Sequence, residues 1–188
     1  MGGKKAWVLS IFGLFCILGL SSTGLGWQPP SATQRLLLQY DALGPCTPAA
    51  DWGAIDRTAA ERVVYLTNDH RTRLGLRPLL VEPALSASAV WKSLHMGRFG
   101  YFDHEDPAPP IARTIFDRVL DCGYVNRYVG EDIAAGQASA EETMGEWLAS
   151  PGHRRVIENP AYSEVGVGVA QTSRGRRYWT LDLGRGRL

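Results

Sequence analysis

The sequence has almost no net charge, and this is the first constraint on its function. Its 20 lysines and arginines nearly balance 19 aspartates and glutamates, so the formal net charge of the 188 residues is +1 at pH 7. A protein whose main partner is nucleic acid or an anionic membrane surface usually carries a clear positive excess. We therefore expect no nucleic-acid partner, and contact with a membrane only through the N-terminal segment.

Long apolar runs are also scarce, and the only one lies at the N-terminus. Residues 6–20 are apolar apart from one serine, follow Lys4 and Lys5, and precede the small residues 21–24. This is the layout of a secretory signal. An uncleaved anchor is the alternative, because a continuation to Trp27 gives about 20 residues, enough to span a bilayer. We expect residues 1–26 to be a signal peptide or a membrane anchor, and the rest to be extracytoplasmic.

Cysteine is rare as well, with three residues at positions 16, 46 and 122. Cys16 lies in the N-terminal segment, so export would leave Cys46 and Cys122 as an even pair in an oxidising compartment. A disulfide closing a loop of roughly 75 residues would contribute about 4 kcal/mol in the chain-entropy view. Two unrelated thiols are the alternative, and a catalytic thiol at Cys122 is disfavoured because nothing nearby in sequence would activate it.

The chain has no internal repeats and no low-complexity tract, and its length allows one domain with a sizeable core plus appendages. Residues 27–57 contain four prolines and two glycines around a short apolar run at residues 36–38. This composition is typical of a spacer or arm with at most one short helix. We assign residues 58–188 to the folded domain.

Helix signals begin at Thr58, which has the spacing of a capping box with Glu61 and predicts a helix that stops at Gly75. Three more helices are expected: one from Pro83, one from about residue 111 to 123, and one from the capping box of Ser139 and Glu142 to just before Pro151.

The C-terminal region changes period. Alternate residues are valine from 165 to 169, and residues 179, 181 and 183 are apolar after a turn at Arg174 and Gly175. Alternation with a period of two on both sides of a glycine turn predicts a β-hairpin. Helices followed by antiparallel strands indicate an α+β fold in layers.

Two polar loops carry candidate chemistry. His104 is flanked by Asp103, Glu105 and Asp106, which could stabilise an imidazolium or orient a neutral imidazole for metal binding. A solvated loop histidine is the alternative. Glu131, between a glycine and a run of small residues, is a candidate acid, base or ligand, or else a turn carboxylate that caps backbone amides.

His153 follows Pro151 and Gly152 just past the last predicted helix. This turn could hold the imidazole rigidly toward a cleft, or place it near the helix C-terminus, where it would interact with the helix dipole. His70 and His95 fall on predicted helices, so we expect surface or packing roles for them.

Together these motifs resemble a known family. From about Thr58 to Gly184 the chain is similar to the secreted bacterial branch of the CAP superfamily (cysteine-rich secretory proteins, antigen 5 and pathogenesis-related 1). The resemblance rests on motifs in the family's order: Asn68-Asp-His-Arg71, Gly75-Leu-Arg-Pro78-Leu79, Met96, His104, Arg118, Gly123-Tyr124, Gly130-Glu-Asp-Ile-Ala134, Trp147, Ser150-Pro-Gly-His-Arg154, Gly166-Val-Gly168 and Tyr178-Trp-Thr180.

The resemblance implies a three-layer α-β-α sandwich with a small antiparallel sheet and a surface cleft. In the family the cleft holds two histidines and two acidic residues, and in some members the histidines bind a divalent metal such as Zn²⁺. His104, Glu131 and His153 match three of these positions, which makes them the expected metal ligands.

The sequence departs from the family's pattern in two places. Ser150 stands at the position of the second acid, and Asp132 stands where an asparagine usually follows the glutamate. Glu146 precedes Ser150 by one helical turn, so we hypothesise that it reaches the cleft. Exposure on the outer face of the helix is the alternative.

Three functions follow from these expectations. The first is a non-enzymatic extracytoplasmic module that binds a lipid, a small ligand or an envelope protein, with or without metal in its cleft. The second is a hydrolase in which a metal-activated water lies between His104 and His153, with Glu131 as the base. A triad on Ser150 is less favoured, because no glycine-flanked nucleophile elbow surrounds it. The third is a structural subunit anchored to an envelope assembly.

Overall fold

The computed structural model describes residues 46–186, which form five helices and five strands. The predictions for residues 1–26 and for the apolar run at 36–38 lie outside this part of the chain. Within residues 46–186, no helix combines the length and the apolar character needed to cross a membrane.

The centre of the fold is one mixed sheet. Four of its strands are antiparallel neighbours in the order β1 (Ala54–Ile55), β4 (Glu164–Gln171), β5 (Arg177–Gly184) and β3 (Val129–Ala135). The short β2 (Leu80–Val81) pairs in parallel with β4. The predicted hairpin is confirmed, since Glu164 to Gln171 pair residue by residue with Gly184 to Arg177.

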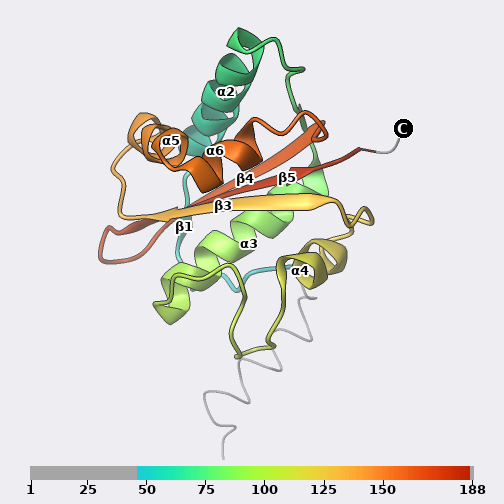
Figure 1. Cartoon of the computed structure of the whole chain (residues 1–188). Coiled ribbons are helices and arrows are strands. Elements are labelled where there is room, and N and C mark those ends of the chain that lie inside the picture. The colour runs from blue at the N-terminus through green and yellow to red at the C-terminus, as the bar shows by residue number, and fades with distance from the viewer. Residues whose placement is uncertain (1–45, 187–188) are drawn as a thin grey trace, which may run out of the picture.

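Helices cover both faces of this sheet (Figure 1). On one face lie α2 (Arg57–Arg73), α5 (Ala140–Ala149) and α6 (Pro151–Ile157). On the other lie α3 (Pro83–Phe99) and α4 (Ile115–Asp121). The α+β class and the three-layer α-β-α sandwich that the sequence predicts are therefore confirmed.

Alternation along the strands gives the two faces different side chains. Val165, Val167 and Val169 of β4 point into the main core with α2 and α5, together with Trp179 of β5. Gly166 and Gly168, which lie between these valines, face α3. A Cβ atom added to Gly168 would lie 2.2 Å from the backbone of Ala89 in α3, so the glycine lets the helix pack directly against the strand.

Two helix starts differ from the sequence prediction. The capping box at Thr58 is wrong: the N-cap of α2 is Asp56, whose side chain accepts from the amide of Ala59. The reason is that Asp56 leaves the sheet with its own amide still bonded to Val169, which places it at the helix entrance. The predicted helix from residue 111 begins instead at Ile115, behind a capping box of Thr114 and Asp117.

The loop expected around His153 is also wrong. Pro151 occupies the first position of α6, where its fixed φ favours a helix and its missing amide costs nothing. His153 therefore lies on a short helix that follows α5 directly. The expected turn around Glu131 is wrong as well, because this residue lies in β3.

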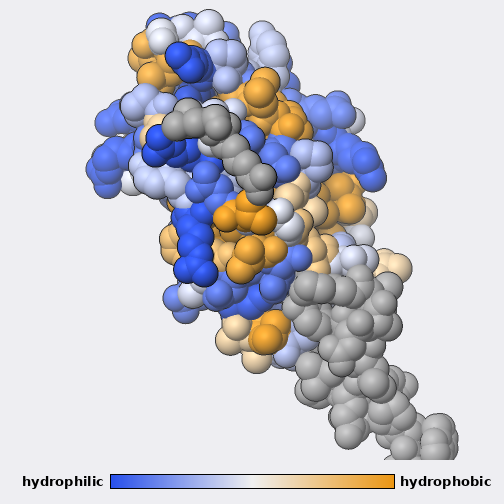
Figure 2. Space-filling view, turned by 90° about the vertical axis from the view of Figure 1, so that its right-hand side faces the viewer, coloured by the Kyte–Doolittle hydropathy of each residue, from blue (hydrophilic) through white to orange (hydrophobic). Residues whose placement is uncertain are grey.

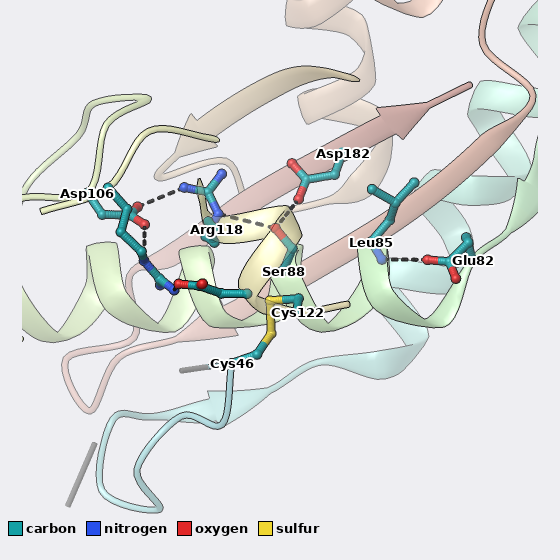
Figure 3. Close-up of a disulfide and its surroundings, with 10 residues drawn as sticks. Cys46, Glu82, Leu85, Ser88, Asp106, Arg118, Cys122 and Asp182 are labelled. Carbon is teal, nitrogen blue, oxygen red and sulfur yellow. Dashed lines mark hydrogen bonds and ion pairs between the residues drawn. A yellow bond between two sulfur atoms is a disulfide. The ribbon is translucent and has the colours of Figure 1, made fainter. Parts of the chain in front are cut away.

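Cys46 and Cys122 form a disulfide with their Cα atoms 5.0 Å apart (Figure 3). The bond joins the first described residue to the end of α4. Past it, Ala49 and Trp52 are buried in a small core with Trp91. The second half of the predicted spacer, residues 46–57, thus packs into the fold.

Apolar side chains also gather in the middle of one face of the molecule, with polar side chains around them (Figure 2). Across the described residues, the exposed large apolar side chains include Leu80, Val81, Phe116, Leu120 and Val125.

The close contact at Gly168 generates a stability prediction. Gly168→Ala should destabilise the protein by about 3 kcal/mol or more, because the new methyl group meets backbone atoms of α3 and not a movable side chain. Urea unfolding followed by circular dichroism measures this loss. Gly145→Ala is the matched control: it lies exposed in α5 with no neighbour within 4 Å, so it should be neutral or stabilising by up to about 1 kcal/mol. Equal effects of the two changes would contradict the packing argument.

Candidate functional site

Strand β3 carries the central acidic pair of the site. Successive side chains of a strand point to opposite faces, and here Glu131 points toward α4 while Asp132 points toward the face covered by α2, α5 and α6. Glu131 is 8% exposed and Asp132 is fully buried. The two carboxylates therefore belong to different surroundings although they are neighbours in sequence.

Glu131 is held from both sides. Its Oε1 accepts from Nδ1 of His104 at 2.8 Å, and its Oε2 accepts from the Nη2 group of Arg118. The guanidinium is fully buried, whereas the His104 side chain is 54% exposed. Since the carboxylate can only accept, His104 donates through Nδ1 and its Nε2 is left as the acceptor nitrogen.

Arg118 is the hub of a buried charged network. Its Nη1 donates to Asp106 at 2.8 Å, and its Nε donates at 3.2 Å to Ser88, which in turn donates to Asp182 at 2.7 Å (Figure 3). Burial alone would lower the pKa of Arg118, but the carboxylates of Glu131, Asp182 and Asp106 outweigh it and raise this pKa above its ordinary value. The guanidinium is therefore a permanent cation.

Asp106 has further cationic neighbours. Nζ of the fully buried Lys92 lies 2.9 Å from its Oδ1, and the same ammonium donates to the backbone carbonyls of His104 and Glu105. Lys92 thus binds the histidine-bearing loop by its backbone. This loop, which the sequence leaves without regular structure, is fixed to α3 and α4 by charge-assisted hydrogen bonds.

His153 lies on α6. It lines a cavity of about 420 Å³ whose wall also contains Phe102, Ile133, Ala134, Ala135, Gln137, Glu146, Trp147, Ser150 and Arg176. The loop of His104 reaches the same cavity through Phe102. Burial and, to a smaller extent, the nearby His104 lower the pKa of His153 from its ordinary value. The structure thus brings the imidazoles near enough for their charges to interact and favours the neutral form of His153.

The residues proposed from the family pattern occupy distinct places. Glu146 and Ser150 both line the cavity, and Nε2 of Gln137 donates to Oε2 of Glu146 at 2.5 Å. Ser150 occupies the N-cap position of α6, and its side chain makes no capping hydrogen bond. Its amide bonds back to the end of α5, so its position is set by the junction of the two helices.

Asp132 is outside the cavity and beneath the helical layer. Within the described part of the chain, neither of its oxygens has a hydrogen-bond partner, and it is among the groups that raise the pKa of Tyr162, which places it on the α6 side. Burial, followed by the charge of Glu131, raises the pKa of Asp132 to about 8. Asp132 is therefore a neutral carboxylic acid at pH 7.

The donor set fits a divalent metal only in part. Among residues 46–186 there is no cluster of three histidine, cysteine, aspartate or glutamate side chains arranged to hold a metal. The imidazoles of His104 and His153 are ligands that Zn²⁺ accepts. Both oxygens of Glu131 already accept hydrogen bonds, which suits a residue that orients a ligand better than one that binds the metal itself.

The basic half of the network was missed from sequence. Arg118 belongs to the family's pattern, but only the fold shows that it holds Glu131. Lys92 lies on the buried side of α3 beside Trp91, and a lysine among apolar helix residues is the one signal that could have indicated a buried ion pair.

Most of the described chain matches a known protein family. The cysteine-rich secretory protein family, CAP, matches residues 64–183. The chain belongs to this family.

Curated relatives of this CAP protein come from Bacillus subtilis. The uncharacterized protein YkwD is 39% identical over 123 residues, which are 65% of this chain and 46% of YkwD. The uncharacterized membrane protein YlbC is 31% identical over 133 residues, which are 70% of this chain and 36% of YlbC. The chain thus spans less than half the length of either relative.

Solved structures share the fold. An extracellular protein with an SCP domain from Bacillus anthracis matches with a TM-score of 0.63 and 26% identity, over 70% of this chain and 41% of that one. An outer surface protein of Borrelia burgdorferi matches with a TM-score of 0.65 and 17% identity, over 72% of this chain and 99% of that one.

The buried Asp132 generates a pH prediction. Its pKa is near 8 in the folded protein and about 3.9 in an unfolded chain, so the native state holds a proton that the unfolded state releases. Stability should therefore fall as pH rises from about 4 to 8. Asp132→Asn should remove this part of the decline, so that its stability relative to the parent is lowest at pH 5 and increases steadily toward pH 8.

Urea unfolding of both proteins between pH 5 and 9 measures the difference, which isolates Asp132 from Asp182, whose pKa is also raised by burial to about 8. Asp69→Asn, on the exposed side of α2, is the matched control and should leave the slope unchanged. A parallel pH dependence of the parent and Asp132→Asn would show that Asp132 is ionised in the fold.

Proposed function

We propose that this chain is an extracytoplasmic CAP module that binds a ligand or partner in the cleft between His104 and His153, without turning it over chemically. The location is supported by the disulfide of Cys46 and Cys122, since such bonds persist in oxidising compartments. The extracellular SCP-domain protein of Bacillus anthracis, 26% identical, points the same way. We propose a lipid, a small ligand or an envelope protein as the occupant of the cleft.

One observation carries the proposal: the imidazole of His104 is oriented before any ligand arrives. Glu131 accepts the hydrogen bond from its Nδ1 at 2.8 Å, and the buried Arg118 holds that carboxylate in turn. Such preorganisation lowers the entropic cost of binding at the exposed face of the ring. The cavity beside it combines an apolar floor of Ile133 and Trp147 with polar residues at the rim, which is typical of a binding pocket.

We propose that a divalent ion such as Zn²⁺ can also occupy the cleft, with the two imidazoles as its protein ligands. We infer that His104 and His153 would bind it directly, while Glu131 would orient His104 from behind. Glu146, which lines the same cavity, is the nearest substitute for the acid that Ser150 replaces. Bound metal would supply an electrophilic centre for an anionic or carbonyl group of the partner.

A hydrolase is the less favoured function. Ser150 occupies the N-cap position at the junction of α5 and α6, and Glu131, the acid that a serine triad would need to orient His153, is bonded to His104 instead. Glu131 is occupied by His104 and Arg118, which leaves it poorly placed to take a proton from water. The geometry therefore supports binding over cleavage.

Calorimetric zinc titration tests the site. The parent should bind about one ion, and His104→Ala or His153→Ala should abolish binding, because each removes one of two imidazole ligands. Glu131→Gln should weaken affinity by roughly 10–100-fold, as loss of an orienting partner does. Affinity should fall as pH drops and the imidazoles take protons.

His70→Ala is the matched control, since His70 pairs with Glu158 outside the cavity; it should bind like the parent. Equal affinity of all variants would move the metal elsewhere, and absence of binding by the parent would remove metal from the proposal. Peptide hydrolysis by the zinc-loaded parent that disappears in His104→Ala would overturn the non-enzymatic function.

A further inference from the structure

A second cavity, separate from the histidine cleft, lies between α2 and α3 beside β1. Its volume is about 590 Å³, and it shares no lining residue with the cleft. Its wall is mainly apolar and includes Ile55, Ala60, Val64, Val81, Ala87 and Val90. We call it the α2–α3 groove. Ile55 and Val81 remain 42% and 62% exposed, which is unfavourable for apolar side chains unless something covers them.

The described chain enters the fold at this groove. Cys46 and Pro48 are themselves part of its wall. The disulfide to Cys122 at the end of α4 fixes Cys46 there (Figure 3). The residues that precede Cys46 are therefore tethered at the edge of an apolar groove.

The sequence before Cys46 has the pattern of a groove-binding helix. Leu36, Tyr40 and Leu43 are spaced i, i+4, i+7, the anchor positions of an amphipathic helix that lies in an apolar groove. Leu38, two residues after the first anchor, would point to the opposite side. Ten residues separate Leu36 from Cys46 and would span about 15 Å as a helix. Since Cys46 itself lines the groove, all three anchors lie close enough to enter it.

Charges at the groove and in this segment are complementary. The groove includes Arg57 and Glu61, one helical turn apart on α2. The segment carries Arg35 directly before its first anchor and Asp41 between its second and third anchors. One opposite charge is thus available for each charged residue of the groove.

We propose that the α2–α3 groove binds residues 35–45 of the same chain, as a helix whose anchors Leu36, Tyr40 and Leu43 fill it. The tether at Cys46 makes this binding intramolecular, so the effective concentration is in the millimolar range or above. The docked segment would join the N-terminal region rigidly to the domain and hold the histidine cleft in one orientation. This function is additional to ligand binding and does not depend on it.

Limited trypsin digestion of the exported protein, read by mass spectrometry, tests the docking. Trypsin cuts after Arg35, and a docked segment protects this bond. Tyr40→Ser/Leu43→Ser removes two anchors without altering the residues next to the bond, and Ala87→Trp fills the groove from α3. Each should raise the cleavage rate at Arg35 by roughly tenfold, because protection requires the closed state. The matched control Leu38→Ser should cleave at the parent's rate.

Three results would overturn the proposal. The first is parent cleavage at Arg35 as fast as in the anchor variant. The second is protection that disappears on dilution, which would make a second copy the occupant. The third is a co-purified lipid in the native mass spectrum of a parent that trypsin cuts freely. Thermal unfolding checks that the Ala87→Trp variant folds. If it does not fold, the Tyr40→Ser/Leu43→Ser variant still tests the docking.

Discussion

The fold and the cleft both depend on the buried guanidinium of Arg118. It binds Asp106, from the loop that carries His104, and Glu131, from β3 at the edge of the sheet. Removing one partner of a buried ion pair costs about 3–5 kcal/mol, because the charge that remains is buried without compensation. The network therefore stabilises the point at which α4, the histidine loop and β3 meet. The disulfide at Cys122 fixes the end of the same helix.

The two walls of the cleft are held in place by different interactions, one by ion pairs and the other by apolar packing. The His104 wall is an exposed loop positioned by charge, with Lys92 and Arg118 as buried cations. The His153 wall is a short helix positioned by packing, because Ile157 at its end is fully buried in the main core. A pocket with both walls fixed and an apolar floor is suited to binding. Glu131, bonded to both His104 and Arg118, orients one of the two imidazoles.

Much of the architecture was predictable from the sequence, because valine and glycine alternate in β4 and apolar residues repeat with helical spacing in α2, α3 and α5. The cleft residues His104 and His153 were predictable only through the family's motifs. Strand β3 was missed because it carries one carboxylate on each face, and Glu131 and Asp132 interrupt the apolar pattern of a strand. The Arg118 network was missed because it joins residues from distant segments, and no local spacing encodes such contacts.

Nitrogen NMR of the His104 imidazole tests the central claim most directly. If Arg118 holds Glu131 and Glu131 accepts from His104, the neutral ring should carry its proton on Nδ1 and leave Nε2 free. The Glu131→Gln variant should lose this preference, while His153→Ala should keep it. A parent in which His104 is protonated on Nε2, or exchanges equally between the two forms, would contradict the account.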